Sequence, residues 1–213
     1  MYLVELYKII EDGENSGVEF KRKFSEPEKI AKEMIAFANS KGGVILFGVD
    51  DNRDIVGVES EKGELELIDA AAKFYCEPEV EYEYEIAEMK NKDIVVVSVP
   101  ESKFKPHKLI SEKIPEDSRV YIRSKDKSVI ASKETVNLLK HSNPDSKPLM
   151  ISYGKSEKQI LDYLKENERI TVNEFKKLAN ISRRRASRTI VNLVRAGVII
   201  HNRQDDFEFY TLA

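Results

Sequence analysis

The sequence predicts an α+β fold in which a mixed-sheet domain is followed by a small domain of helices and a β-hairpin. Short apolar runs of strand length alternate with segments of helical periodicity as far as residue 141. Residues 142–152 begin with two prolines among small polar side chains, which is typical of a linker. Helical periodicity returns at residue 153 and gives way to strand-like runs near the C-terminus. We therefore expect two domains, at residues 1–141 and 153–213.

Helices and strands are mixed within the first domain. The continuous apolar run Val44–Val49 indicates a strand that is buried on both faces, and Ile55–Val58 is expected to pair with it. Ser132 is expected to cap a helix that continues to about Lys140. Apolar periodicity further predicts helices at 3–10, 27–39 and 64–74, and strands at 18–21, 80–86, 94–99 and 119–123.

The second domain carries clear helix-start signals. Capping boxes are predicted at Ser156–Gln159 and Thr171–Glu174, and Ser182 is expected to cap a third helix that stops at Gly197. Strand-like runs on both sides of residues 201–206 then predict a hairpin. This order of helices, turn and hairpin is that of a winged helix-turn-helix domain.

The predicted third helix has two distinct faces. Ala186, Ile190 and Leu193 share one face, whereas Arg184, Arg188, Val191 and Arg195 form a stripe on the opposite one. In a helix-turn-helix this helix enters the major groove, where arginine pairs with guanine or grips phosphate. A solvated charged face is the alternative interpretation. The candidate nucleic-acid-binding residues are Arg183, Arg184, Arg185, Ser187, Arg188 and Arg195 on the helix, Lys105 in a basic segment around Phe104, and Arg203 in the wing.

Charge is distributed unevenly along the chain. The net charge is -3, but residues 153–213 carry +4 and the remainder carries -7, which favours contact between the second domain and a polyanion. No apolar run is long enough to span a membrane, and the first residues do not resemble a signal peptide. Cys76 is the only cysteine, so an internal disulfide is excluded and a small buried side chain is expected. A cytoplasmic location is the simplest expectation.

Three motifs in the first domain follow one another in a recognisable order. They are Glu14–Lys21 (ENSGVEFK), Ile35–Gly43 (IAFANSKGG) and Leu46–Asp51 (LFGVDD). This series resembles the schlafen AlbA-type domain, a family once catalogued as divergent AAA ATPases. The resemblance extends through Lys105–His107 and Val120–Arg123 and covers roughly residues 3–140. Prokaryotic members are often followed by a winged helix and are described as DNA-binding transcriptional regulators.

The resemblance also implies an enzymatic alternative. Some animal schlafen proteins are RNA endonucleases, and their three acidic residues fall on the motif positions of Glu14, Glu19 and Asp51. Such carboxylates would bind Mg²⁺ or Mn²⁺ to activate water. This chain departs from the nucleases because it has one AlbA-type lobe and lacks their Cys/His zinc site. For Phe37, Asn39, Gly42 and Gly43 we expect a role in the fold rather than in chemistry.

These observations together favour a DNA-binding regulator that forms a homodimer. DNA is favoured over RNA, and no cofactor is expected unless the chain is a metal-dependent nuclease. A divalent-metal endoribonuclease and a protein-interaction module are the two alternatives. ATP hydrolysis is not favoured, because no phosphate-binding loop of the Walker type is present in the sequence.

Overall fold

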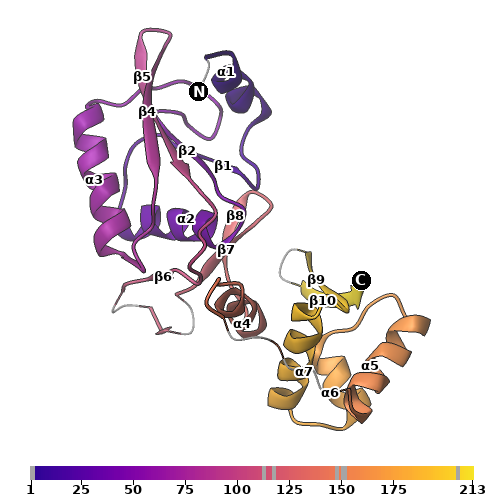
Figure 1. The fold of residues 1–213 in the computed structure, drawn as a ribbon. Coiled ribbons are helices and arrows are strands. Elements are labelled where there is room, and N and C mark those ends of the chain that lie inside the picture. The colour runs from indigo at the N-terminus through magenta and orange to yellow at the C-terminus, as the bar shows by residue number, and fades with distance from the viewer. Residues whose placement is uncertain (1–2, 112–113, 117–118, 147–148, 150–152, 205–206) are drawn as a thin grey trace. The chain divides into compact units, whose positions relative to one another are not determined.

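The chain divides into two compact units, Met1–Ser132 and Lys133–Ala213 (Figure 1). The computed structural model describes residues 3–111, 114–116, 119–146, 149, 153–204 and 207–213. Both units contain helices and strands, and the larger sheet combines parallel with antiparallel pairing, so the predicted α+β class with a mixed sheet is confirmed. The expected domain boundary at residue 141 differs from this division by the length of one helix.

The first unit is built around a four-stranded sheet. Its strands β1 (Val18–Lys21), β2 (Gly43–Phe47), β5 (Lys92–Val99) and β4 (Glu83–Met89) lie in that order. β1 pairs with β2 in parallel, whereas β2 with β5 and β5 with β4 are antiparallel. The remaining elements of the unit are α1 (Leu3–Asp12), α2 (Pro27–Asn39), α3 (Glu61–Phe74), β3 (Cys76–Glu77), β6 (Lys108–Leu109), β7 (Tyr121–Ser124) and β8 (Lys127–Ile130).

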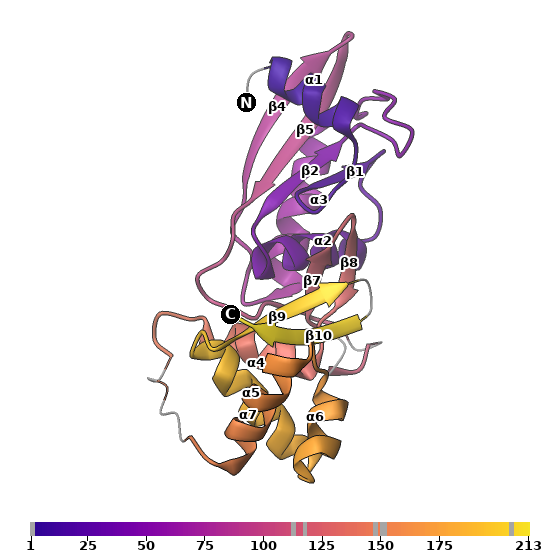
Figure 2. The same ribbon diagram turned by 90° about the vertical axis from the view of Figure 1, so that its right-hand side faces the viewer.

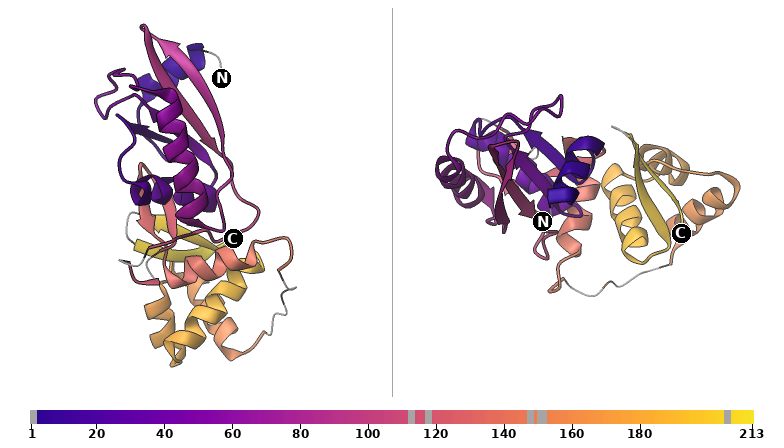
Figure 3. Two further views of the ribbon diagram at one scale, coloured as in Figure 1. Left: turned by 90° about the vertical axis from the view of Figure 1, so that its left-hand side faces the viewer. Right: turned by 90° about the horizontal axis from the view of Figure 1, so that it is seen from above.

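Helices cover both faces of this sheet (Figure 2 and Figure 3). Ile45 and Phe47 of β2 pack with α2 and α3 on one face. Leu46 packs against α1 on the other face, in a smaller cluster that includes Leu6 and Ile10. The prediction that this strand is buried on both faces is therefore confirmed. β4 forms one edge of the sheet, and its residues Glu83 to Ile86 are exposed.

Ile55–Val58 is not a strand, so the predicted partner of β2 is wrong. Gly48 adopts a positive φ of 96° directly after β2, which turns the chain out of the sheet. The amides of Val56 and Gly57 then donate to the Gly48 carbonyl, and only an isolated bridge joins Val49 to Ile55. The neighbours of β2 are β1 and β5, because long-range pairing overrides the local pattern.

Smaller differences concern strand ends and one missed hairpin. Val80 packs in the core beside α3, and β4 begins only at Glu83. β8 was not predicted, although it pairs with β7 across a turn at Lys125. Cys76 is buried as expected, and burial raises the pKa of its thiol to about 12, which keeps the thiol protonated and inert.

The end of α2 is fastened by Asn39. Its side-chain amide donates to the carbonyls of His107 and Tyr121, both at 2.9 Å, and its Oδ1 accepts from the His107 amide at 2.8 Å. Position 43 requires glycine, because a Cβ there would lie 2.2 Å from the Phe37 ring. These contacts confirm that Asn39 satisfies backbone groups and explain the AFANSKGG motif as a packing requirement.

Replacement of Asn39 by aspartate tests this fastening. In Asn39→Asp the donating amide becomes a carboxylate oxygen that faces two carbonyl oxygens in the core. We expect the free energy of unfolding to fall by at least about 2 kcal/mol, since buried groups are left unpaired. Urea denaturation measures this loss. The exposed Asn52→Asp should change stability by less than about 0.5 kcal/mol, and equal effects of the two substitutions would contradict the assignment.

The second unit contains four helices and a hairpin within its described residues. These elements are α4 (Lys133–His141), α5 (Lys155–Glu166), α6 (Val172–Ala179), α7 (Arg183–Arg195), β9 (Ile199–Gln204) and β10 (Phe207–Leu212). Its core joins Ile160, Phe175, Ile190 and Tyr210, so α5, α6, α7 and the hairpin form one body. No helix in the described part of the chain combines the length and the apolar character that a membrane span needs.

Helix capping in this unit follows the sequence in part. The Thr171–Glu174 capping box is confirmed, as is Ser182 as the cap of α7. The box predicted at Ser156 is wrong, because α5 begins at Lys155 and the Gly154 amide donates to Glu157 instead. Gly197 has a positive φ of 68° just after α7, as expected. Residues 147–148 and 150–152 of the expected linker, and residues 205–206 of the expected hairpin, lie outside the described residues.

Candidate functional site

The start of α7 presents arginines to solvent. Asn180 ends α6 in the left-handed conformation, and the Ser182 hydroxyl accepts from the Arg185 amide at 3.2 Å. This turn sets the direction in which α7 leaves α6. Arg183, Arg184, Arg185 and Arg188 are exposed, and Ser187 is half-buried.

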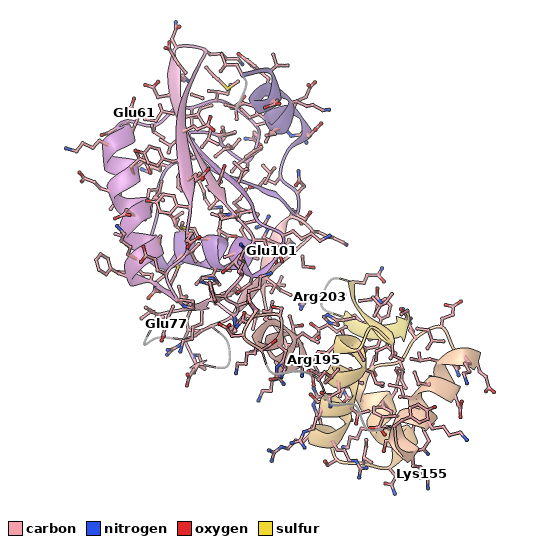
Figure 4. All side chains as sticks on the ribbon, in the orientation of Figure 1. Glu61, Glu77, Glu101, Lys155, Arg195 and Arg203 are labelled. Atoms are coloured by element: carbon pink, nitrogen blue, oxygen red, sulfur yellow. The ribbon has the colours of Figure 1, made fainter. Side chains whose placement is uncertain are left out.

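The two faces of α7 behave differently. Ala186, Ile190 and Leu193 are buried in the core of the unit, as their spacing predicts. On the opposite face Val191 is only 4% exposed and Arg195, labelled in Figure 4, is half-buried. The predicted stripe is therefore open over its first two turns and covered further along.

The later turns of α7 are covered by α4, a helix that the sequence analysis places in the first domain. α4 and α7 lie side by side within the second unit (Figure 2). The Arg183 guanidinium meets the Glu134 carboxylate at 3.3 Å and also donates to Asn173 at 2.8 Å. Glu134 is only 3% exposed, an unusual burial for a carboxylate and a sign that its pairing matters. Sequence reasoning missed these partners, because no local pattern links α4 to α7.

A second contact joins α4 to the hairpin. The Thr135 hydroxyl donates to Glu208 at 3.1 Å, and Arg203 donates to the same carboxylate oxygen at 2.9 Å. His201 lies 3.6 Å from the other oxygen of Glu208. Arg203, labelled in Figure 4, was expected to bind nucleic acid from the wing. The structure instead pairs it across the hairpin, with its side chain 15% exposed.

Between α4 and α7 lies a cavity of about 550 Å³, which we call the α4–α7 recess. Arg183, Arg184, Ser187 and Arg188 line it from α7, so four sequence candidates meet there. Sequence reasoning did not anticipate the residues of α4 that complete it. The recess is lined by Lys133, Glu134, Asn137, His141, Arg183, Arg184, Ser187, Arg188, Val191 and Asn192.

Lys105 takes a structural position rather than the surface position expected of a nucleic-acid contact. The residue is 8% exposed, and its ammonium donates to Glu101 at 2.6 Å and to the Ser40 carbonyl at 3.1 Å. The neighbouring Phe104 remains exposed. The ammonium of Lys105 is therefore used within the first unit, where it holds the loop against the end of α2.

Glu19 of the first motif shares a buried guanidinium, that of Arg123, with Glu33 of α2. Arg123 of β7 donates to Glu19 at 2.8 Å, to Glu33 at 3.2 Å and to the Asn15 carbonyl at 2.8 Å. Lys21 also pairs with Glu19. The Arg123 side chain is 1% exposed, so its charge depends on these acceptors. The structure thus assigns Arg123 to ion pairing with acids inside the first unit.

Glu19 and Asp51 both lie within electrostatic range of Glu14. Burial raises the pKa of Glu14, the Phe20 amide opposes this by donating at 2.8 Å, and the charges of Glu19 and Asp51 raise it further. Among the described residues no group of three His, Cys, Asp or Glu side chains is arranged to hold a metal ion. Because Glu19 is already paired with two cations, the three carboxylates as they stand do not fit a shared divalent ion.

Removal of the exposed Asp51 charge tests this electrostatic proximity. We expect the Glu14 pKa to fall slightly in Asp51→Asn, because one repulsive neighbour is removed. A titration of the Glu14 side-chain carboxyl followed by NMR measures it. In Asp54→Asn, which removes a nearby exposed charge that does not contribute to the shift, the Glu14 pKa should stay unchanged. An identical response to both variants would show that Asp51 lies outside this cluster.

The fold and these motifs define an AlbA-type α+β domain with a second, helical unit attached. The family model "Schlafen, AlbA_2" matches residues 14–132, more than half of the chain. The chain therefore belongs to the Schlafen AlbA_2 family. A comparison with curated proteins finds no match.

Two solved structures are similar to this chain. The DIP2311 protein of Corynebacterium diphtheriae is 15% identical with a TM-score of 0.50, over 76% of this chain and 36% of that one. The chain thus spans about a third of that protein. The N-terminal domain of a RecG-related protein from Nitrosomonas europaea is 23% identical with a TM-score of 0.41, over 62% of this chain and 92% of that one. At 15% identity, the similarity to the DIP2311 protein concerns the fold alone.

Proposed function

We propose that the chain binds duplex DNA through α7 and regulates transcription. In this proposal α5, α6, α7 and the β9–β10 hairpin form a winged helix-turn-helix, with α7 as the helix that enters the major groove. The single observation that carries the proposal is the exposed row of arginines at the start of α7. Membership of the Schlafen AlbA_2 family also supports the proposal, because prokaryotic members of this family are described as DNA-binding transcriptional regulators.

The electrostatics of α7 favour a polyanion. Among the residues that the structure describes, no hydrogen bond or ion pair engages the guanidinium of Arg184, Arg185 or Arg188. Unpaired guanidinium groups on a helix face attract phosphate, and their planar fork also matches the O6 and N7 atoms of guanine. Arg183 is partly neutralised by Glu134, so it contributes less. Affinity should therefore rest chiefly on Arg184, Arg185 and Arg188.

Neutralisation of two of these arginines tests the proposal. In Arg184→Gln/Arg188→Gln the slope of log K against log salt should fall by about 1 for each DNA phosphate that the variant no longer neutralises, with weaker duplex binding overall. Fluorescence anisotropy over a salt series measures both quantities. The control is a pair of exposed lysines of α5, Lys155→Gln/Lys158→Gln, which removes the same charge and should leave the slope nearly unchanged. If both double variants bind like the native protein, α7 does not contact the duplex.

The same assay separates duplex DNA from other partners. Parallel titrations with single-stranded DNA and a folded RNA should give weaker binding, since the fit of α7 to the major groove of B-DNA would be lost. We further propose a homodimer, because paired half-sites raise the affinity of helix-turn-helix proteins. Sedimentation equilibrium measures the mass of the free chain. Absence of binding to all nucleic acids at physiological salt would favour the protein-interaction module instead.

The ribonuclease alternative has one supporting observation, the electrostatic proximity of Glu14, Glu19 and Asp51. The pairing of Glu19 with Arg123 and Lys21 weighs against it, since a metal would compete with two cations. We therefore expect the native chain and Glu19→Gln to give the same result when each is incubated with folded RNA and Mn²⁺ and the RNA is examined on denaturing gels. Glu61→Gln, on the first turn of α3, serves as the control. Cleavage that is lost only in Glu19→Gln would establish the enzyme.

A further inference from the structure

The α4–α7 recess is more than the flank of a DNA-reading helix. Both of its walls belong to the second unit, and its volume of about 550 Å³ is in the range of small-molecule sites. The recess extends inward from the surface, because its lining includes the buried Val191 as well as the exposed Arg184 and Arg188. A cavity of this kind admits a compact ligand more readily than the rigid surface of a duplex.

The charge of the recess specifies the ligand. Four cationic side chains line it, Lys133, Arg183, Arg184 and Arg188, against the single carboxylate of Glu134. That carboxylate is buried and already bonded to Arg183, so it does not compensate Arg184 or Arg188. Arg184 and Arg188 find no acceptor within the described ranges. The recess therefore has an excess of positive charge that an anion would balance.

The neutral groups of the recess suit phosphate oxygens. Asn137 of α4, together with Ser187 and Asn192 of α7, adds hydrogen-bond donors to the lining. Guanidinium forks bind phosphate through two parallel hydrogen bonds, and such charge-assisted bonds are stronger than neutral ones. His141 reports the local field: burial lowers its pKa, and the positive charges of Arg195 and Lys140 lower it further. An anion in the recess would oppose these two charges.

We propose that the α4–α7 recess binds a small ligand that carries two or more phosphate groups, and that this ligand competes with DNA. The first part stands on the recess alone. The second part rests on the proposed function, because Arg184 and Arg188 would serve both the ligand and the duplex. A phosphate in this recess comes either from the free ligand or from the DNA backbone, and the two sources share the same chemistry.

Inorganic pyrophosphate is the probe for the binding site. We expect the full chain to bind it saturably with one site in calorimetry, more tightly than sulfate at equal ionic strength. In NMR titrations the His141 pKa should rise when pyrophosphate is bound, since a nearby anion favours the imidazolium. Absence of saturable binding, or binding that leaves the His141 resonances unmoved, would overturn the site.

A charge placed on α4 locates the binding within the recess. Asn137→Asp sets a carboxylate in the recess without altering α7, and should weaken pyrophosphate binding by about ten-fold or more through loss of a donor and repulsion. Gln159→Glu adds the same charge on α5, outside the recess, and should bind pyrophosphate like the native chain. Equal behaviour of the two variants would place the pyrophosphate elsewhere.

Displacement of a fluorescent duplex tests the competition. Pyrophosphate should release the duplex from the native chain at concentrations where sulfate of equal ionic strength does not, and Asn137→Asp should need about ten-fold more pyrophosphate. Equal release by sulfate would mean screening and would overturn the competition. If the duplex does not bind at all, the proposed function fails, while calorimetry and the His141 titration still decide whether the recess is a phosphate site.

Discussion

The buried guanidinium of Arg123 is the interaction on which the N-terminal unit depends. Its charge is almost completely removed from water, so it must be balanced inside the protein. The balancing groups are the Glu19 carboxylate of β1, the Glu33 carboxylate of α2 and the Asn15 carbonyl of the loop before β1. The β7–β8 hairpin is not part of the main sheet, and this ion-pair cluster fixes it there. Two sequence motifs more than a hundred residues apart are thus halves of one electrostatic unit.

The same cluster decides how the acidic motif residues are interpreted. Glu19 sits where a metal-dependent nuclease would need a ligand, yet its oxygens are held by Arg123 and Lys21. Glu19 and Glu33 replace water as the partners of this buried arginine. Conversely, Arg183 at the start of α7 pairs with the Glu134 carboxylate, whereas no hydrogen bond or ion pair engages the guanidinium of Arg184, Arg185 or Arg188 among the described side chains. Cations that are paired support the fold, whereas cations left unpaired are available to a ligand.

Much of the fold was predictable because it is determined locally. The periodicities of α1, α2 and α3, the caps at Thr171 and Ser182, and the apolar runs of β2 and β5 each depend on neighbouring residues. Ile55–Val58 has the same apolar composition as a strand, but Gly48 turns the chain away and the sheet takes other partners. Local pattern cannot reveal which strands pair across the sequence.

The candidate site shows the same division between local and long-range information. The arginine face of α7 follows from helical spacing, whereas its cover by α4 arises from Glu134 and Thr135, which lie about fifty residues earlier. Lys105 and Arg203 are basic in the sequence, but Glu101 and Glu208 neutralise them in space. Only contacts distinguish a cation that is used internally from one that is offered to a partner.

The free edge of the main sheet carries a consequence for association. β4 exposes backbone groups that would accept another strand, as sheet edges generally do. Glu83, Glu85 and Glu88 repeat along this edge. Antiparallel addition of β4 from a second copy would bring carboxylates opposite one another, which is unfavourable at neutral pH. The edge thus discourages polymerisation of the sheet, and the homodimer that we propose would have to use another surface.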